Sequence, residues 1–154
     1  MNAKELLEKY PFLESKKEEL ERAGYLNDDG VDEFKVVAHF IKTGDLDTVK
    51  AFIESGYDVN SSESGDFGSS LLHNAIRYGQ MEIFNYLIDH GADIDFVDAV
   101  GWTPMMEAII DSKPEFGRIL AQKGADQSII NQKGATAKML AIKFGQHAFL
   151  EFLN

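Results

Sequence analysis

The sequence predicts an all-α solenoid, in which short helix-turn-helix units stack on one another. Three observations predict it. Gly68, Gly101 and Gly134 recur at a constant interval, and the same interval separates Gly91 from Gly124. Each interval holds two apolar stripes at helical spacing, separated by residues that end helices. No such helix pair can bury its apolar face alone, so neighbouring units must stack to form a continuous core.

The periodicity divides the chain into a helical N-terminal cap and four repeats. We assign the cap, which has the pattern of a degenerate repeat, to residues 1–30 and the repeats to about 31–63, 64–97, 98–130 and 131–154. In the cap, Ser15 and Glu18 have the spacing of a capping box, which predicts a helix start ahead of Leu20.

The repeat that starts near residue 98 shows the local pattern most clearly. Thr103 can cap free backbone N–H groups, and Pro104 suits the first position of a helix because its missing donor is not needed there. Ser112 ends this first helix and Pro114 opens a second. Gly124 then supplies the left-handed residue with which many helices end.

At this point the motifs are identifiable. The segment GADIDFVDAVGWTPMMEAI closely resembles the ankyrin repeat, and DFGSSLLHNAI keeps its Gly, Leu-His and Ala. The resemblance covers residues 31–154, and residues 1–30 more loosely. It implies short hairpin loops between the helix pairs and a buried hydrogen bond from His73 to a neighbouring loop. It also implies that partners bind in a concave groove formed by the hairpin tips and the first helices.

Placing the family's contact positions on this chain gives a set of candidate partner-binding residues. They are Phe34, Asp66, Phe67, Arg77, Tyr78, Val100, Trp102, Ile110, Asp111, Lys133 and Phe144. Trp, Tyr and Arg are the residues most often found as binding hot spots. Trp102 is the only Trp of the chain and is expected to point outward, toward a partner; the alternative is that it folds over Val100 or a neighbouring hairpin as a local lid.

Charge restricts the kinds of partner that we expect. The chain has 26 acidic and 15 basic residues, a net charge of −11, which argues against nucleic acid because Lys and Arg supply that affinity. Residues 1–100 carry 21 acidic and 9 basic side chains, and this negative field would speed association with a basic protein. Ordinary solvation of exposed helices explains part of the asymmetry.

Nothing in the sequence indicates catalysis, a metal or a cofactor. The chain has no cysteine, which excludes thiolate zinc sites and disulfides, and it lacks EF-hand, GxSxG, Walker and GxGxxG motifs. Asp93, Asp98 and Asp126 are interpreted as turn residues whose carboxylates bind local backbone N–H groups. An enzyme with an active site between repeats is the remaining outside hypothesis, and a catalytic role for His73 would revive it.

The sequence therefore predicts a non-catalytic protein–protein interaction module that binds through the concave groove. Under this heading, an adaptor and an acidic inhibitor, of the immunity-protein type that blocks a basic enzyme or toxin, stay open. We expect a monomer in the cytoplasm that does not bind membranes. No apolar run approaches the ~18–20 residues of a membrane span, and the N-terminus MNAKELLEKYPFLESKKEEL has no signal-peptide core.

Overall fold

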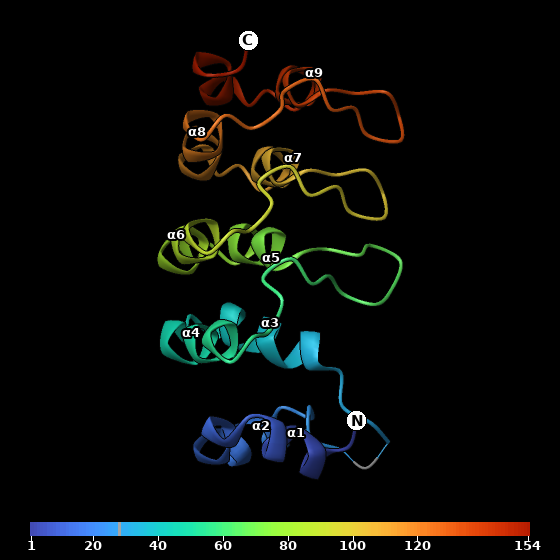
Figure 1. Cartoon of the computed structure of the whole chain (residues 1–154). Helices are drawn as coiled ribbons and strands as arrows, with labels where there is room; N and C mark the ends of the chain where they lie inside the picture. Colours follow the sequence, from blue (N-terminus) through green and yellow to red (C-terminus); the bar gives the residue numbers. More distant parts are fainter. Residues whose placement is uncertain (28) are drawn as a thin grey trace. The chain divides into compact units, whose positions relative to one another are not determined.

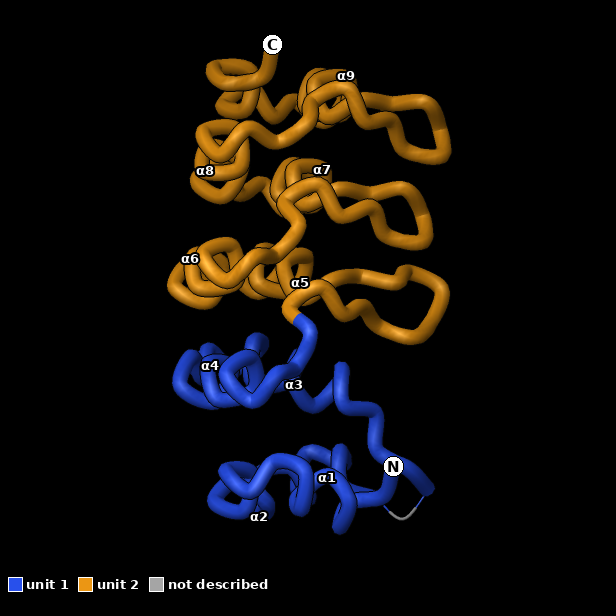
Figure 2. The backbone as a smooth tube through the Cα atoms, in the orientation of Figure 1, with its two compact units in different colours: residues 1–58 blue, residues 59–154 orange. Residues whose placement is uncertain are grey.

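The computed structural model describes residues 1–27 and 29–154, so residue 28 of the predicted cap lies outside the described residues. The chain divides into two compact units, residues 1–58 (unit 1) and 59–154 (unit 2), coloured separately in Figure 2. Every regular element of the described residues is a helix, which confirms the predicted all-α fold. The finer division into a cap and four repeats stays a prediction.

Unit 1 consists of helices packed around buried aromatic and aliphatic side chains. Its elements are α1 (Ala3–Lys9), the 3₁₀ helix η1 (Pro11–Lys16), α2 (Lys17–Arg22), α3 (Glu33–Thr43) and α4 (Leu46–Glu54). Phe52 lies at the centre, fully buried, with the Tyr10 ring 4.8 Å and the Phe12 ring 5.0 Å away in edge-to-face contacts. Such pairs add stabilisation beyond the area that they bury.

One predicted helix start in unit 1 is wrong. Ser15 lies inside η1, where its hydroxyl donates to the carbonyl of Phe12, and α2 begins at Lys17 without a side-chain cap. Pro11 starts the 3₁₀ turn ahead of this point, so the Ser15 hydroxyl bonds back to the preceding turn and cannot cap a following helix. The capping box of unit 1 is formed at α1 instead, by Asn2 and Glu5.

Unit 2 consists of three successive helix pairs. The pairs are α5 (Leu71–Arg77) with α6 (Met81–Asp89), α7 (Pro104–Ile110) with α8 (Pro114–Gln122), and α9 (Ala137–Lys143) with the 3₁₀ helix η2 (His147–Glu151). Each first helix starts at a capping hydroxyl, and the three caps are evenly spaced along the chain. Ser70, Thr103 and Thr136 accept the backbone N–H of the third residue that follows, at 3.3 Å in each case. The repeat of the sequence is therefore a repeat of helix starts.

The pairs of unit 2 stack in chain order. Helix α5 packs against α7 and α7 against α9, while α8 packs against η2. The fully buried rings of Phe84 and Phe116, 5.0 Å apart and edge to face, join α6 to α8. Figure 1 shows the three long loops of unit 2, residues 59–70, 90–103 and 123–136, projecting from the same side of the stack. This arrangement places side chains of different loops beside one another.

The described residues contain no helix with both the length and the apolar character that crossing a bilayer requires.

Candidate functional site

Two of the three long loops of unit 2 contain the same turn, one at Asp98 and one at Asn131. The Asp98 carboxylate accepts the backbone N–H groups of Val100 and Trp102 at 3.0 and 2.8 Å. Asn131, at the same position of the next repeat, accepts those of Lys133 and Ala135 in the same way, at 2.9 and 3.0 Å. The predicted turn role of Asp98 is thus confirmed. Side-chain oxygens satisfy the turn backbone, so these loops have a defined conformation before anything binds.

Neighbouring loops are also joined to each other. The Ala99 N–H donates to the carbonyl of Phe67 at 2.8 Å, and the Gln132 side-chain amide donates to the carbonyl of Ala99 at 2.8 Å. The loops that carry Phe67, Ala99 and Gln132 therefore form one connected row. Such a row loses little conformational entropy when a partner binds, because it is already ordered.

His73 anchors this row to the helices. It is fully buried, its Nδ1 lies 2.8 Å from the Ser70 hydroxyl, and its Nε2 lies 3.1 Å from the Trp102 carbonyl oxygen. Burial lowers the pKa of His73 to about 4, so the ring is neutral near pH 7 and Nε2 carries the proton that it donates to Trp102. The buried hydrogen bond that the family resemblance implied is confirmed. The imidazole is fully engaged in structure.

A hollow of about 260 Å³ opens next to Trp102, and we call it the Trp102 hollow. Its lining comes from two loops and two first helices: Phe67, Arg77, Asp98, Val100, Trp102, Glu107 and Ile110. Phe67 and Ile110 are 62% and 45% exposed, and both border the same depression. Trp102 and Val100 are half-buried. The hollow is therefore bordered by one exposed aromatic ring, one exposed aliphatic side chain and two half-buried apolar side chains.

A salt bridge between α5 and α7 borders the Trp102 hollow. Arg77 Nε donates to Glu107 at 2.8 Å, and Arg77 Nη2 donates to the Ser69 hydroxyl at 3.1 Å. Lys113 also fixes the end of α5, since its ammonium donates to the carbonyls of Ile76 and Arg77. The Glu107 side chain is 11% exposed and that of Arg77 35%. This pair links two repeats at the edge of the hollow and gives the apolar depression a fixed polar boundary.

The ionisation of this pair reflects its burial and its acidic neighbours. Burial raises the pKa of Glu107, the charges of Asp111 and Asp98 raise it further, and Arg77 offsets only part of this rise. Burial by itself would lower the pKa of Arg77, but the Glu107 carboxylate reverses the effect, so that the pKa is raised and the guanidinium stays charged. The site thus places several carboxylates around one half-buried cation.

A second hollow, of about 230 Å³, lies on the other side of Val100 and Trp102. We call it the Lys133 hollow; it is lined by Val100, Trp102, Asn131, Gln132 and Lys133. Lys133 is its only charged lining residue, and its side chain is exposed. The segment with Val100 and Trp102 therefore forms a ridge between two small depressions, one beside the Arg77–Glu107 pair and one beside a lysine.

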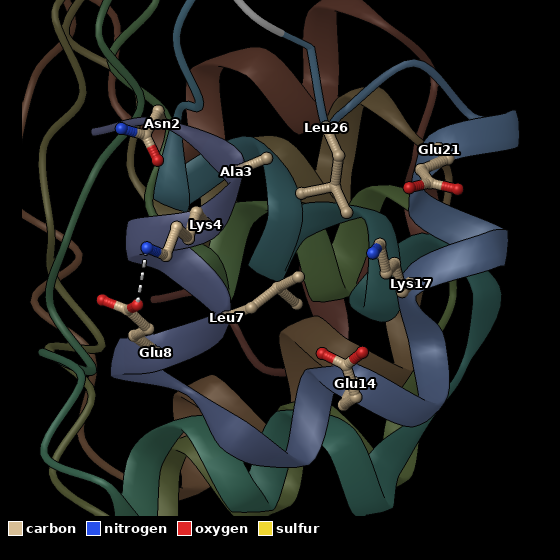
Figure 3. A pocket seen from close by; sticks show the side chains of 9 residues that line it. All are labelled: Asn2, Ala3, Lys4, Leu7, Glu8, Glu14, Lys17, Glu21 and Leu26. Carbon is tan, nitrogen blue, oxygen red and sulfur yellow. Dashed lines mark ion pairs between the residues drawn. The ribbon is translucent and has the colours of Figure 1, made fainter.

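Unit 1 has a larger depression of a different kind. This N-terminal hollow measures about 820 Å³ and is lined by Asn2, Ala3, Lys4, Leu7, Glu8, Glu14, Lys17, Glu21 and Leu26. Figure 3 shows Leu7 of α1 and Leu26 of the loop after α2 pointing into it, with charged side chains around them. The ion pair drawn there, Lys4 with Glu8 at 3.6 Å, is mostly exposed, at 84% and 66%. None of the predicted contact residues lies here.

The structure brings together about half of the predicted contact residues. Phe67, Arg77, Val100, Trp102 and Ile110 line the Trp102 hollow, and Lys133 lines its neighbour. The two interpretations of Trp102 are both compatible with this geometry. The indole lies next to Val100, as a lid would, and also borders two open depressions.

Other predicted residues lie outside both hollows. Asp66 is exposed next to Phe67, and Tyr78 and Phe144 are 38% and 45% exposed. Asp111 follows α7, and its Oδ2 is buried with no hydrogen-bond partner among the described residues.

The prediction that Phe34 contacts a partner is wrong. It is only 6% exposed, because it lies in the first turn of α3 on the same buried face as Val37 and Ile41. Its ring belongs to the core of unit 1, so it cannot supply the exposed aromatic contact that the sequence predicted.

Sequence reasoning missed Glu107 and Asn131 as members of the site, and gave Asp98 only its turn role. Glu107 follows Arg77 by 30 residues, and the register of two stacked repeats was the only signal that could have paired them. No group of three His, Cys, Asp or Glu side chains suited to a metal ion occurs among the described residues.

Comparison with known proteins agrees with the geometry of the fold. The family model for ankyrin repeats (3 copies) matches residues 35–131 and 91–154. The chain belongs to the ankyrin-repeat family. Members of this family generally mediate protein–protein interaction.

Three relatives indicate the range of proteins that share these repeats. Protein phosphatase 1 regulatory subunit 27 of Homo sapiens is 36% identical over 94 residues, covering 61% of this chain and 60% of the relative. An ankyrin repeat-containing protein of Treponema pallidum is 30% identical over 119 residues, 75% of this chain and 39% of the relative. Protein phosphatase 1 regulatory subunit 12A of Mus musculus is 34% identical over 94 residues, 60% of this chain and 9% of the relative. The chain thus spans about three-fifths of the length of the first of these curated relatives.

Proposed function

We propose that this chain is a non-catalytic recognition module that binds a partner protein through the loop row of unit 2, with Trp102 at the centre of the contact. The observation that carries the proposal is the Trp102 hollow. Side chains of two repeats line this depression, and its apolar lining includes the exposed Phe67 and Ile110 and the half-buried Trp102. Interfaces concentrate their binding energy in such aromatic anchors at well-packed pockets.

The rigidity of the loop row supports this proposal. Asp98 and Asn131 hold the turns, and hydrogen bonds through Ala99 and Gln132 join each loop to the next. A partner would meet a surface that needs no further ordering, which lowers the entropic cost of association. Two of the relatives are named regulatory subunits of protein phosphatase 1, which are proteins that act together with another protein. These names and the ordered loop row support a protein as the partner of this chain.

A basic partner is the finer version of the proposal. The charges of Asp98 and Asp111 act on Glu107, which lines the Trp102 hollow, and Glu63 acts on Arg77 through its charge. The field of these carboxylates favours an approaching cation and would speed association at low salt. This charge keeps the inhibitor hypothesis beside the adaptor hypothesis. Once a partner is known, association rates measured across NaCl concentrations separate them, since the inhibitor hypothesis requires a steep fall with salt and an unchanged rate contradicts it.

Replacing Trp102 tests the contact surface. We expect Trp102→Ala to weaken binding of the partner by about thirty-fold, the factor that corresponds to a hot spot of about 2 kcal/mol. Phe67→Ala, at a side chain that is 62% exposed and carries little of the fold, should weaken it as well. The measurement is capture of partners from native lysate on immobilised wild type and variants, followed by titration of the purified partner.

Met139→Ala is the matched control, because Met139 is 54% exposed in the same unit and lines neither hollow. Circular dichroism of each variant shows whether it remains folded. If Trp102→Ala and Phe67→Ala retain the same partner with wild-type affinity, the contact surface has been placed wrongly.

A further inference from the structure

The two hollows on either side of Trp102 have the dimensions of side-chain sites. At about 260 and 230 Å³, each is smaller than the ~300–1,000 Å³ of typical small-molecule pockets. They share one wall, formed by Val100 and Trp102. Side chains that occupied both would have to be near neighbours in the partner. A single extended segment laid across the Trp102 ridge meets this condition, because its successive residues lie only ~3.3 Å apart.

The Trp102 hollow is suited to an apolar side chain. Its walls are the exposed Phe67 and Ile110 with the half-buried Trp102 and Val100. Its charged lining groups are already engaged: Glu107 with Arg77, and Asp98 with the backbone of its own turn. A charged group at the bottom of this hollow would have to compete with these bonds, whereas a bulky aliphatic or aromatic side chain would not.

The two sides of the ridge differ in charge. Toward the preceding loop lie Asp66, which is exposed beside Phe67, and Glu63, which acts electrostatically on Arg77. Toward the following loop, the Lys133 hollow offers the exposed ammonium of Lys133 as its only charge. Opposite charges on the two sides of the ridge would select the order of charges in a bound segment, since the reversed order places like charges together.

Resting on the proposed function, we infer that unit 2 binds an extended segment of its partner with a fixed charge order. A bulky apolar residue enters the Trp102 hollow, a basic residue lies on its Asp66 side, and an acidic residue lies on its Lys133 side. This surface therefore recognises a segment with a basic, an apolar and an acidic residue in that order. Trp102 lies between the site for the apolar residue and the site for the acidic residue.

The first test is selection of random peptides displayed on phage, against immobilised wild type and against Trp102→Ala in parallel. We expect wild type to enrich peptides that share a bulky apolar residue flanked by a basic and an acidic residue. Trp102→Ala should not enrich them. If the selected peptides share an apolar residue without this charge order, the inference is overturned while the proposed contact surface stands. If both proteins enrich the same peptides, the contact surface itself is wrong.

A charge-swap experiment decides the order. Binding of the synthetic consensus peptide, measured by fluorescence polarisation, should weaken about tenfold in Asp66→Lys and about tenfold in Lys133→Glu. A peptide whose basic residue is replaced by Glu should bind Asp66→Lys better than wild type. One whose acidic residue is replaced by Lys should likewise prefer Lys133→Glu.

The matched controls are Asp89→Lys and Lys123→Glu, which make the same changes in charge at exposed positions that line neither hollow. Both should bind the consensus peptide as wild type does. Equal losses in the controls would show that only the net charge of the protein matters, and no rescue by the swapped peptides would show that Asp66 and Lys133 do not face the charged residues of the peptide; either result overturns the inference. If the selection yields no enriched peptide, the inference is overturned as well. The proposed function is then tested separately, by capturing partners from lysate with wild type and Trp102→Ala.

Discussion

The N-terminal hollow and the Trp102 hollow differ in size and in the contacts that surround them. The first measures about 820 Å³ and the second about 260 Å³. In the larger one, the ion pair of Lys4 and Glu8 is exposed and joins two residues of a single helix. In the smaller one, the ion pair of Arg77 and Glu107 joins two repeats, and His73 donates a hydrogen bond to the Trp102 carbonyl. Cross-repeat support, rather than volume, distinguishes the hollow that we propose as a recognition site.

The largest effect on stability is expected where two loops of unit 2 contact each other, at Gly101 and Gln132. Gly101 has a φ of +85°, and a Cβ there would lie 2.7 Å from the backbone nitrogen of Gln132. We expect Gly101→Ala to lower the free energy of unfolding by about 4 kcal/mol, since backbone strain and a clash with backbone atoms add. Gly24→Ala in unit 1, at a φ of +79° where a Cβ would meet no atom of the described residues within 4 Å, should cost about 1 kcal/mol.

Urea denaturation followed by circular dichroism measures both variants. Similar losses for the two glycine replacements would mean that the loops of unit 2 are not held against each other.

Acid should lower the free energy of unfolding, because the buried His73 that hydrogen-bonds to Trp102 is neutral in the folded protein. His73 has a pKa of about 4 in the folded protein against 6.5 as its ordinary value, because burial disfavours the charged ring. Between these pH values the unfolded chain binds a proton that the folded protein does not. This contribution to stability is therefore fully present above pH 6.5 and is lost as the pH falls toward 4. The loss amounts to about 3 kcal/mol.

The measurement is the free energy of unfolding from pH 7 to pH 4 in wild type and in His73→Gln. The variant should show a clearly shallower dependence on pH over this range. Parallel curves for the two proteins would contradict the assignment of this dependence to His73.

Removing one member of the cross-repeat salt bridge should have an intermediate effect. Glu107→Ala leaves the half-buried Arg77 guanidinium without its carboxylate, and we expect a loss of about 2 kcal/mol in the free energy of unfolding. The estimate lies below that for a fully buried pair because the Arg77 side chain is 35% exposed. Urea denaturation of Glu107→Ala, and of Arg77→Ala with Glu107→Ala as a double-mutant cycle, gives the coupling between the two residues.

The smallest effect is expected at the N-terminal hollow. Glu8→Ala removes the exposed partner of Lys4, and we expect a change within about 0.5 kcal/mol, as for exposed pairs four residues apart in a helix. The same denaturation experiment measures it. A loss as large as that of Glu107→Ala would remove the distinction between the two hollows.

Much of the fold was predictable because its signals are local. The even spacing of Ser70, Thr103 and Thr136 is visible in the sequence, and each residue caps a helix without help from distant parts of the chain. The burial of His73 followed from a family pattern. The predicted helix start at Ser15 was wrong because Pro11 begins a 3₁₀ helix that includes Ser15. The Ser15 hydroxyl therefore donates to the Phe12 carbonyl and does not cap a helix, although the spacing of Ser15 and Glu18 matches a capping box.

The sequence by itself determined the helices of unit 2, the period of their repetition and the turn at Asp98. Only the tertiary structure decided which contact candidates meet in one hollow, because that depends on how consecutive repeats are offset and on which face each helix buries. Arg77 joins Glu107 across 30 residues, whereas Phe34 turns into the core beside Val37. Helix starts are set by bonds over three or four residues. A binding surface is set by packing between repeats, which no local pattern encodes.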